Sequence, residues 1–105
     1  MPKKQPPMDP TQGQLLKALG ERLRLARLRR GLAIELVCFK ARISRMTLYR
    51  LEEGSAAIAL GTLTRVLTAL HLQNELELIA RDDHLGRALQ DRKFPPRRRK
   101  PNTAK

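Results

Sequence analysis

Two short apolar-patterned segments, residues 34–41 and 45–52, constrain the fold of this chain more than any other feature. Each segment predicts a helix of about eight residues, and only three residues separate the two. Ser44 is a favoured N-cap for the second helix, and Gly54 is well placed to end it. So short a connection suits two helices that cross at a steep angle.

Apolar residues at helical spacing predict further helices on both sides of this pair. Thr11 or Gln12 opens the first helix, and Gly31 ends it after a basic last turn. We expect helices over Gln14–Arg30, Ile34–Ala41, Arg45–Glu52, Leu60–Leu70 and Gln73–Ala80, with one or two further turns over His84–Gln90. The residues of the fourth helix expected to face inward are Leu60, Leu63, Val66, Leu67 and Leu70.

The composition favours an all-helical core. Apolar residues make up 41 % of the chain, nearly all of them Leu, Ala, Val and Ile, and only three residues are aromatic. Leu and Ala favour helices, whereas strands favour β-branched and aromatic residues. We therefore expect an all-α fold with a compact domain of five helices. We place this domain at 12–81, between a flexible proline-rich arm at 1–11 and a flexible basic tail at 82–105.

The chain carries a strong excess of positive charge. Its 22 lysines and arginines stand against 10 acidic residues, which gives a net charge of +12. A field of that sign attracts polyanions, so nucleic acid is the first partner expected, ahead of an anionic membrane or an acidic protein. Arginine dominates over lysine and forms most of the tail run Arg97–Lys100, and it suits bidentate recognition of phosphate and guanine.

The sequence lacks the residue patterns of an enzyme or a metal site. His71 and His84 have no metal-ligand spacing, and Cys38 has no nearby histidine. Cys38 lies in an apolar stretch and is expected to be a buried hydrophobic residue. We therefore expect no catalytic residue, no metal and no cofactor. With neither a secretory signal nor an apolar run long enough to span a membrane, the protein is expected in the cytoplasm.

The second short helix carries the side chains best suited to contact DNA. In a steeply crossed pair, the first helix can span the DNA backbone while the second enters the major groove. Leu48 and Leu51 are expected to face the core. The outward positions are then Arg45, Met46, Tyr49 and Arg50. An arginine at such a position can bind guanine O6 and N7 bidentately.

From about Leu19 to Leu72 the sequence resembles the Xre/phage-repressor helix-turn-helix family. The resemblance rests on three stretches, LGERLRLARLRRGL, ISRMTLYRLEEG and LGTLTRVLTALHL. The segment Ser44–Gly54 is similar to the family's recognition helix, S-x-x-T-[LI]-x-x-[LI]-E-x-G. This resemblance implies a lambda-repressor-like fold and binding to double-stranded operator DNA.

The resemblance also implies roles for individual residues. Those implied at the DNA are Ser44, Arg45, Met46, Thr47, Tyr49 and Arg50, and we add Arg42 as a possible phosphate contact. Arg45 and Met46 would reach base edges from the start of the recognition helix. Glu52 would form a partly buried ion pair with Arg27 that ties the first helix to the third.

Three positions depart from the family pattern. Ile34 replaces a Gln that commonly contacts phosphate and braces the recognition helix, so this anchor is missing or replaced. Arg42 stands where the turn normally carries Gly, so either Arg42 is mildly strained or the turn is altered. The loop after Gly54 lacks the basic and proline residues with which many members grip the DNA backbone.

The resemblance further implies an assembly and an operon context. Repressors of this type read palindromes as homodimers, and we expect Leu72, Leu76 and Ile79 at the dimer interface. The tail segment Asp83–Gln90, followed by arginines, is similar to tails of Xre-type regulators encoded beside HipA-like kinase toxins. The chain would then be a HipB-type antitoxin component that represses its own operon and binds the kinase. The alternatives are a stand-alone Xre-type repressor and a basic adaptor for RNA or an acidic protein. The adaptor is less supported, because RNA readers usually display stacking aromatics.

Overall fold

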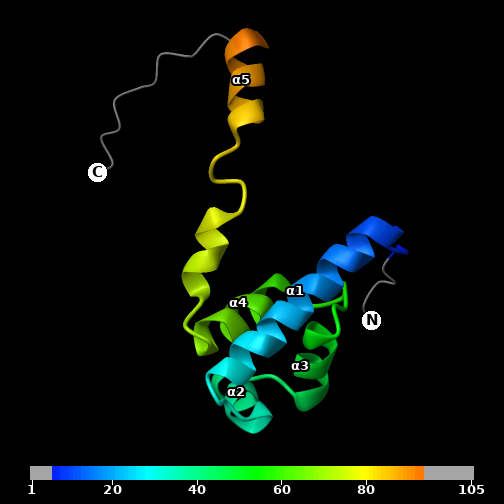
Figure 1. Ribbon diagram of the computed structural model, residues 1–105, viewed down its shortest axis with the longest axis vertical. Coiled ribbons are helices and arrows are strands. Elements are labelled where there is room, and N and C mark those ends of the chain that lie inside the picture. Colours follow the sequence, from blue (N-terminus) through cyan, green and yellow to red (C-terminus); the bar gives the residue numbers. More distant parts are fainter. Residues whose placement is uncertain (1–5, 94–105) are drawn as a thin grey trace.

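The computed structural model describes residues 6–93, and all regular structure in this part of the chain is helical (Figure 1). This confirms the expected all-α fold. The elements are α1 (Pro10–Arg29), α2 (Ile34–Ala41), α3 (Arg45–Glu52), α4 (Leu60–Ala69), the 3₁₀ helix η1 (Gln73–Leu78) and α5 (His84–Lys93). The bounds of α2 and α3 are those expected from the sequence. The start of the proline-rich arm and the arginine run at 97–100 lie outside the described residues.

Helix α1 begins at Pro10, earlier than the expected opening at Thr11 or Gln12. The Asp9 side chain caps it by accepting a hydrogen bond from the Gln12 N–H at 2.9 Å. Proline suits the first helical position because an N–H there would have no partner within the helix. At the other end, Gly31 follows α1 with φ of +64°, the conformation that ends a helix.

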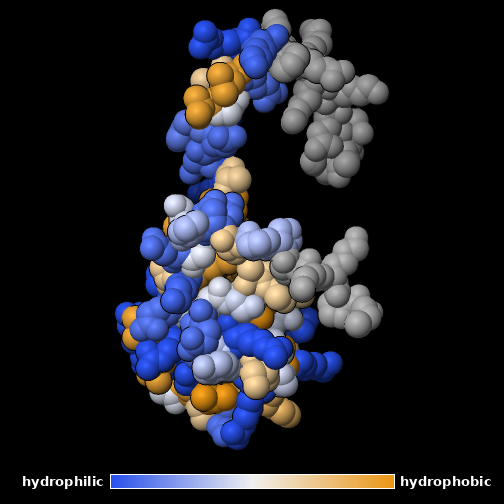
Figure 2. Space-filling view, turned by 90° about the vertical axis from the view of Figure 1, so that its right-hand side faces the viewer, coloured by the Kyte–Doolittle hydropathy of each residue, from blue (hydrophilic) through white to orange (hydrophobic). Residues whose placement is uncertain are grey.

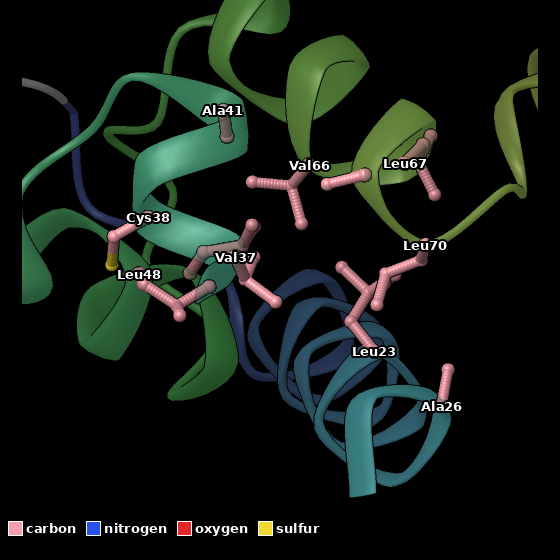
Figure 3. Packing of buried hydrophobic residues seen from close by; sticks show 11 residues of the cluster. Leu23, Ala26, Val37, Cys38, Ala41, Leu48, Val66, Leu67 and Leu70 are labelled. Atoms are coloured by element: carbon pink, nitrogen blue, oxygen red, sulfur yellow. The ribbon is translucent and has the colours of Figure 1, made fainter. Parts of the chain in front are cut away.

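The largest fully buried side chains form the centre of the core, Val37, Leu48, Val66 and Leu70. Figure 3 shows Val37 of α2 between Leu48 of α3 and Val66 of α4, with Leu23 of α1 beside Leu70. Each such side chain contributes about 1.5–3 kcal/mol relative to an exposed one. The core therefore fixes how α2 and α3 are presented, because both helices insert into it.

Two glycines allow α1 to approach the end of α3 at backbone distance. A Cβ atom added at Gly20 would lie 2.5 Å from the Glu52 carbonyl oxygen. Gly54 has φ of +90°, and a Cβ atom there would lie 2.6 Å from the Lys17 Cα atom. Both positions therefore exclude a side chain on steric grounds, and Gly54 also does so by its backbone conformation.

Leu60 is an exception among the fourth-helix residues expected to face inward. Val66, Leu67 and Leu70 are buried and Leu63 is partly buried, but Leu60 is 77 % exposed. Leu60 is the first residue of α4 and precedes the turns that pack against α2. The helical spacing therefore identified the correct face but extended it one turn too far.

The expected α-helix over Gln73–Ala80 was wrong in type and length. The segment forms η1, which starts without a side-chain cap, and Ile79 after it is extended. Ala80 then takes a positive φ of 62°, which interrupts the helix. In contrast, α5 continues to Lys93, beyond the one or two turns expected, with the Asp83 carboxylate accepting a hydrogen bond from the Gly86 N–H at 3.1 Å.

Helix α5 stands apart from the bundle formed by the other helices (Figure 1). Its leucines Leu85 and Leu89 are exposed, and apolar surface is visible on this helix at the top of Figure 2. Among residues 6–93 there is no helix that combines the length and the apolar character needed to cross a membrane.

Candidate nucleic-acid interface

Helix α3 has one buried side and one exposed side. Leu48 and Leu51 anchor it in the core. The residues on its open side are Arg45, Met46, Tyr49 and Arg50, and all four are exposed. Met46 and Tyr49 are large apolar side chains that remain 54 % and 60 % exposed. The sequence-based division of α3 into inward and outward residues therefore matches the burial in the structure.

The start of α3 is capped within its first turn. Ser44 Oγ accepts a hydrogen bond from the Thr47 N–H at 3.1 Å and donates one to Thr47 Oγ1 at 3.0 Å. Because Thr47 Oγ1 is the acceptor, its own hydroxyl hydrogen can point to an outside acceptor such as a phosphate. The N–H groups of the first helical turn, which lack partners within the helix, add positive potential at the same end.

The turn between α2 and α3 keeps its left-handed position although it carries no glycine. Arg42 caps α2 with φ of 58° and ψ of 50°. The sequence left two alternatives, a mildly strained Arg42 or an altered turn. The structure has the first, with Arg42 in a regular left-handed conformation. The end of α2 is closed by Arg65 of α4, whose Nε donates to the Ala41 carbonyl oxygen at 2.8 Å. Sequence reasoning missed Arg65, because its partner is a backbone atom that no side-chain pattern reveals.

Arg27 and Glu52 form the ion pair that the family resemblance implies. Arg27 Nε and Nη2 donate to the two carboxylate oxygens at 2.8 and 3.1 Å, and the side chains are only 9 % and 11 % exposed. Arg27 Nη1 also donates to the Leu32 carbonyl oxygen at 3.3 Å. The hydrogen bond to Glu52 raises the pKa of the Arg27 guanidinium.

A second ion pair joins α2 to α3 on the exposed side. Arg45 Nη2 donates to Glu35 Oε2, and the two side chains are 70 % and 62 % exposed. Sequence reasoning identified Arg45 but not Glu35. The two residues are ten positions apart on different helices, so only the crossing of those helices brings them together.

The helix-turn-helix domain family matches residues 18–78. The chain belongs to the helix-turn-helix domain family. The matched region begins within α1, contains α2 and α3 and ends with η1. Domains of this family bind DNA, typically to regulate transcription and without enzymatic activity. No curated protein and no solved structure gave a significant match to the chain.

The three residues expected at a dimer interface lie at the far end of the helix-turn-helix domain. Leu72 and Leu76 are partly buried and pack against the core, whereas Ile79 is 71 % exposed. They line a groove of about 550 Å³ between α1, α4 and η1. Leu72 and Leu76 are thus partly covered within one copy of the chain, because η1 packs onto α4.

Cys38 is buried in the helix-turn-helix domain, as expected for a small hydrophobic residue. Burial raises the pKa of its thiol, which keeps the reactive thiolate form scarce at neutral pH. His71 directly follows the C-cap residue of α4 and has a positive φ of 62°.

Proposed function

We propose that this chain is a sequence-specific transcriptional repressor in which α3 reads the major groove of operator DNA. The observation that carries the proposal is the open side of α3, which is anchored by Leu48 and Leu51 and presents four exposed side chains. Two of the four are arginines, on a chain with a net charge of +12. Charge of this sign supplies salt-dependent affinity for the DNA backbone, and the exposed side chains supply selectivity.

Each exposed residue receives a role from its position on or beside α3. Arg45 and Met46 contact base edges, because they lie in the first turn of the helix that enters the groove. Tyr49 and Arg50 contact bases or phosphates one turn further on. The residues proposed to bind phosphate are Arg42, Ser44 and Thr47. Thr47 is the better hydroxyl donor of the two, since the Ser44 hydroxyl already donates to it.

We propose that the repressor acts as a homodimer through Leu72, Leu76 and Ile79. The apolar groove that these residues line would be covered by a second copy. Two copies of α3 would then meet successive major grooves, roughly 34 Å apart, and would read a palindrome. We propose that the DNA-binding domain spans residues 12–81. Because α1 begins at Pro10, the start of its first turn extends the domain by two residues.

The finer proposal is that this repressor is a HipB-type antitoxin component that controls its own operon and binds a HipA-like kinase. The similarity of the segment Asp83–Gln90 to tails of such regulators supports this proposal. So do the exposed Leu85 and Leu89, which give α5 apolar surface that a partner could cover. A stand-alone repressor is the alternative, and it would need no such partner. Co-purification of a kinase from the native host would support the antitoxin role, and its absence would favour the alternative.

The DNA-binding proposal is tested by selecting binding sites from randomised duplexes with the wild-type chain and with Arg45→Ala. We expect the wild type to enrich one sequence and the variant to lose preference at one base pair of each half-site. One bidentate arginine contributes about 1–3 kcal/mol of discrimination, roughly 5- to 150-fold. Arg24→Ala is the matched control, since Arg24 is an exposed arginine paired with Glu21 on α1. If Arg45→Ala retains every base preference, Arg45 has no reading role.

A further inference from the structure

We propose that Glu35 is a specificity-determining residue that positions Arg45 for one base pair. The inference rests on the proposed function, because it concerns how α3 reads DNA. It starts from the ion pair between Glu35 Oε2 and Arg45 Nη2, which links the first turn of α2 to the first turn of α3.

Stability does not explain this pair. Both side chains are more than half exposed, at 62 % for Glu35 and 70 % for Arg45. Exposed ion pairs contribute little to folding, since water screens the charges and ordering two long side chains costs entropy. The buried side chains of Val37 on α2 and Leu48 on α3 already join these two helices in the core. The exposed pair therefore needs another explanation.

The position of Glu35 argues for a role in reading DNA. A carboxylate beside the recognition helix repels the phosphates that the rest of the surface attracts, so it weakens binding to every sequence equally. This loss of affinity is offset only at sites where Arg45 donates hydrogen bonds to both Glu35 and the correct base. A guanidinium has five N–H donors, and the pair with Glu35 engages the Nη2 group at one of them. The remaining donors can still bind guanine O6 and N7.

The carboxylate also limits where Arg45 can reach. A free arginine on an exposed helix can contact phosphates on either side of the groove, and such contacts carry no sequence information. Held by Glu35, Arg45 is directed from α3 toward α2, and the entropy of ordering its side chain is lost before DNA binds. Glu35 thus converts a general phosphate-binding cation into a base-reading one.

The test is selection from randomised duplexes, with competition by unrelated DNA, for the wild type, Glu35→Gln and Arg45→Ala. We expect Glu35→Gln to lose preference at the same base pair as Arg45→Ala. Its affinity for unrelated DNA should stay equal or rise, so the ratio of specific to unrelated binding should fall roughly tenfold. The double variant should discriminate no worse than Arg45→Ala alone, because both changes remove one interaction.

The matched control is Glu21→Gln, which removes another acid that is more than half exposed from an arginine pair on α1. It should change no base preference. Wild-type preference in Glu35→Gln overturns the role of Glu35. So does a change at a different base pair, which would mean that Glu35 reads a base directly, as a carboxylate can read the cytosine amino group. An unselective wild type would overturn the proposed function itself, so the two failures are distinguishable.

Discussion

At the scale of single residues, the departures from the family pattern have local consequences. Arg42 keeps the left-handed turn that a glycine would normally supply. Ile34, where a phosphate-binding Gln is usual, is partly exposed at the start of α2, and the next residue, Glu35, bonds to Arg45 instead. The first helix of the motif thus contributes a carboxylate to the exposed side that we propose faces DNA.

Arg42→Gly should separate stability from DNA binding. The left-handed conformation costs a non-glycine residue about 1–2 kcal/mol. Glycine avoids this cost but destabilises the folded state by about 0.5–1 kcal/mol, because it loses more conformational entropy on folding. We expect the variant to be more stable by about 0.5–1 kcal/mol in urea unfolding. Its DNA affinity should fall similarly for all sequences, and the slope of log K against log salt should shrink by about one.

Arg42→Lys is the control, since it keeps the charge and the strained backbone. It should retain the salt slope and gain no stability. An unchanged salt slope in Arg42→Gly would mean that Arg42 does not meet a phosphate.

At the scale of elements, α1 and α3 are joined by close backbone packing at Gly20 and by the ion pair between Arg27 and Glu52. The ion pair could be anticipated from the family resemblance. The close approach could not, because a glycine inside a helix gives no sign of which neighbour it admits. The bounds of α2 and α3 were predictable because the Ser44 cap and the apolar spacing are local signals.

Arg27→Met should destabilise the fold by about 3–5 kcal/mol, because it leaves the Glu52 carboxylate buried without its partner. Glu52→Leu should cost a similar amount. The double variant should recover most of the loss, since two apolar side chains remove both buried charges at once. Urea unfolding of the four proteins measures the coupling. Losses that simply add would show that the pair is not coupled.

At the scale of the whole molecule, the bundle within residues 6–93 leaves apolar surface uncovered in several places, and two of them bear on assembly. One is the groove bordered by Ile79, and the other is the side of α5 that carries Leu85. We propose the first for dimerisation and the second for a partner.

Ile79→Asp tests the first assignment. Since Ile79 is 71 % exposed, the variant should fold but stay monomeric in light scattering at concentrations where the wild type is a dimer. Its affinity for a palindrome should fall about a hundredfold, because two linked copies of α3 bind DNA far more tightly than one. Leu85→Asp is the matched control at the same 71 % exposure and should remain dimeric. A monomeric wild type would contradict the dimer, and a dimeric Ile79→Asp would contradict its location.

The sequence by itself determined the all-α fold, the bounds of the two crossed helices and the outward side of α3. These follow from helical spacing, capping chemistry and composition, which act over a few neighbouring residues. Only the tertiary structure decided that Glu35 bonds to Arg45, that Arg65 closes α2 and that η1 is a 3₁₀ helix packed on α4. Each of these depends on how two helices pack against each other in space, and the buried core around Val37 and Leu48 sets that packing for α2 and α3.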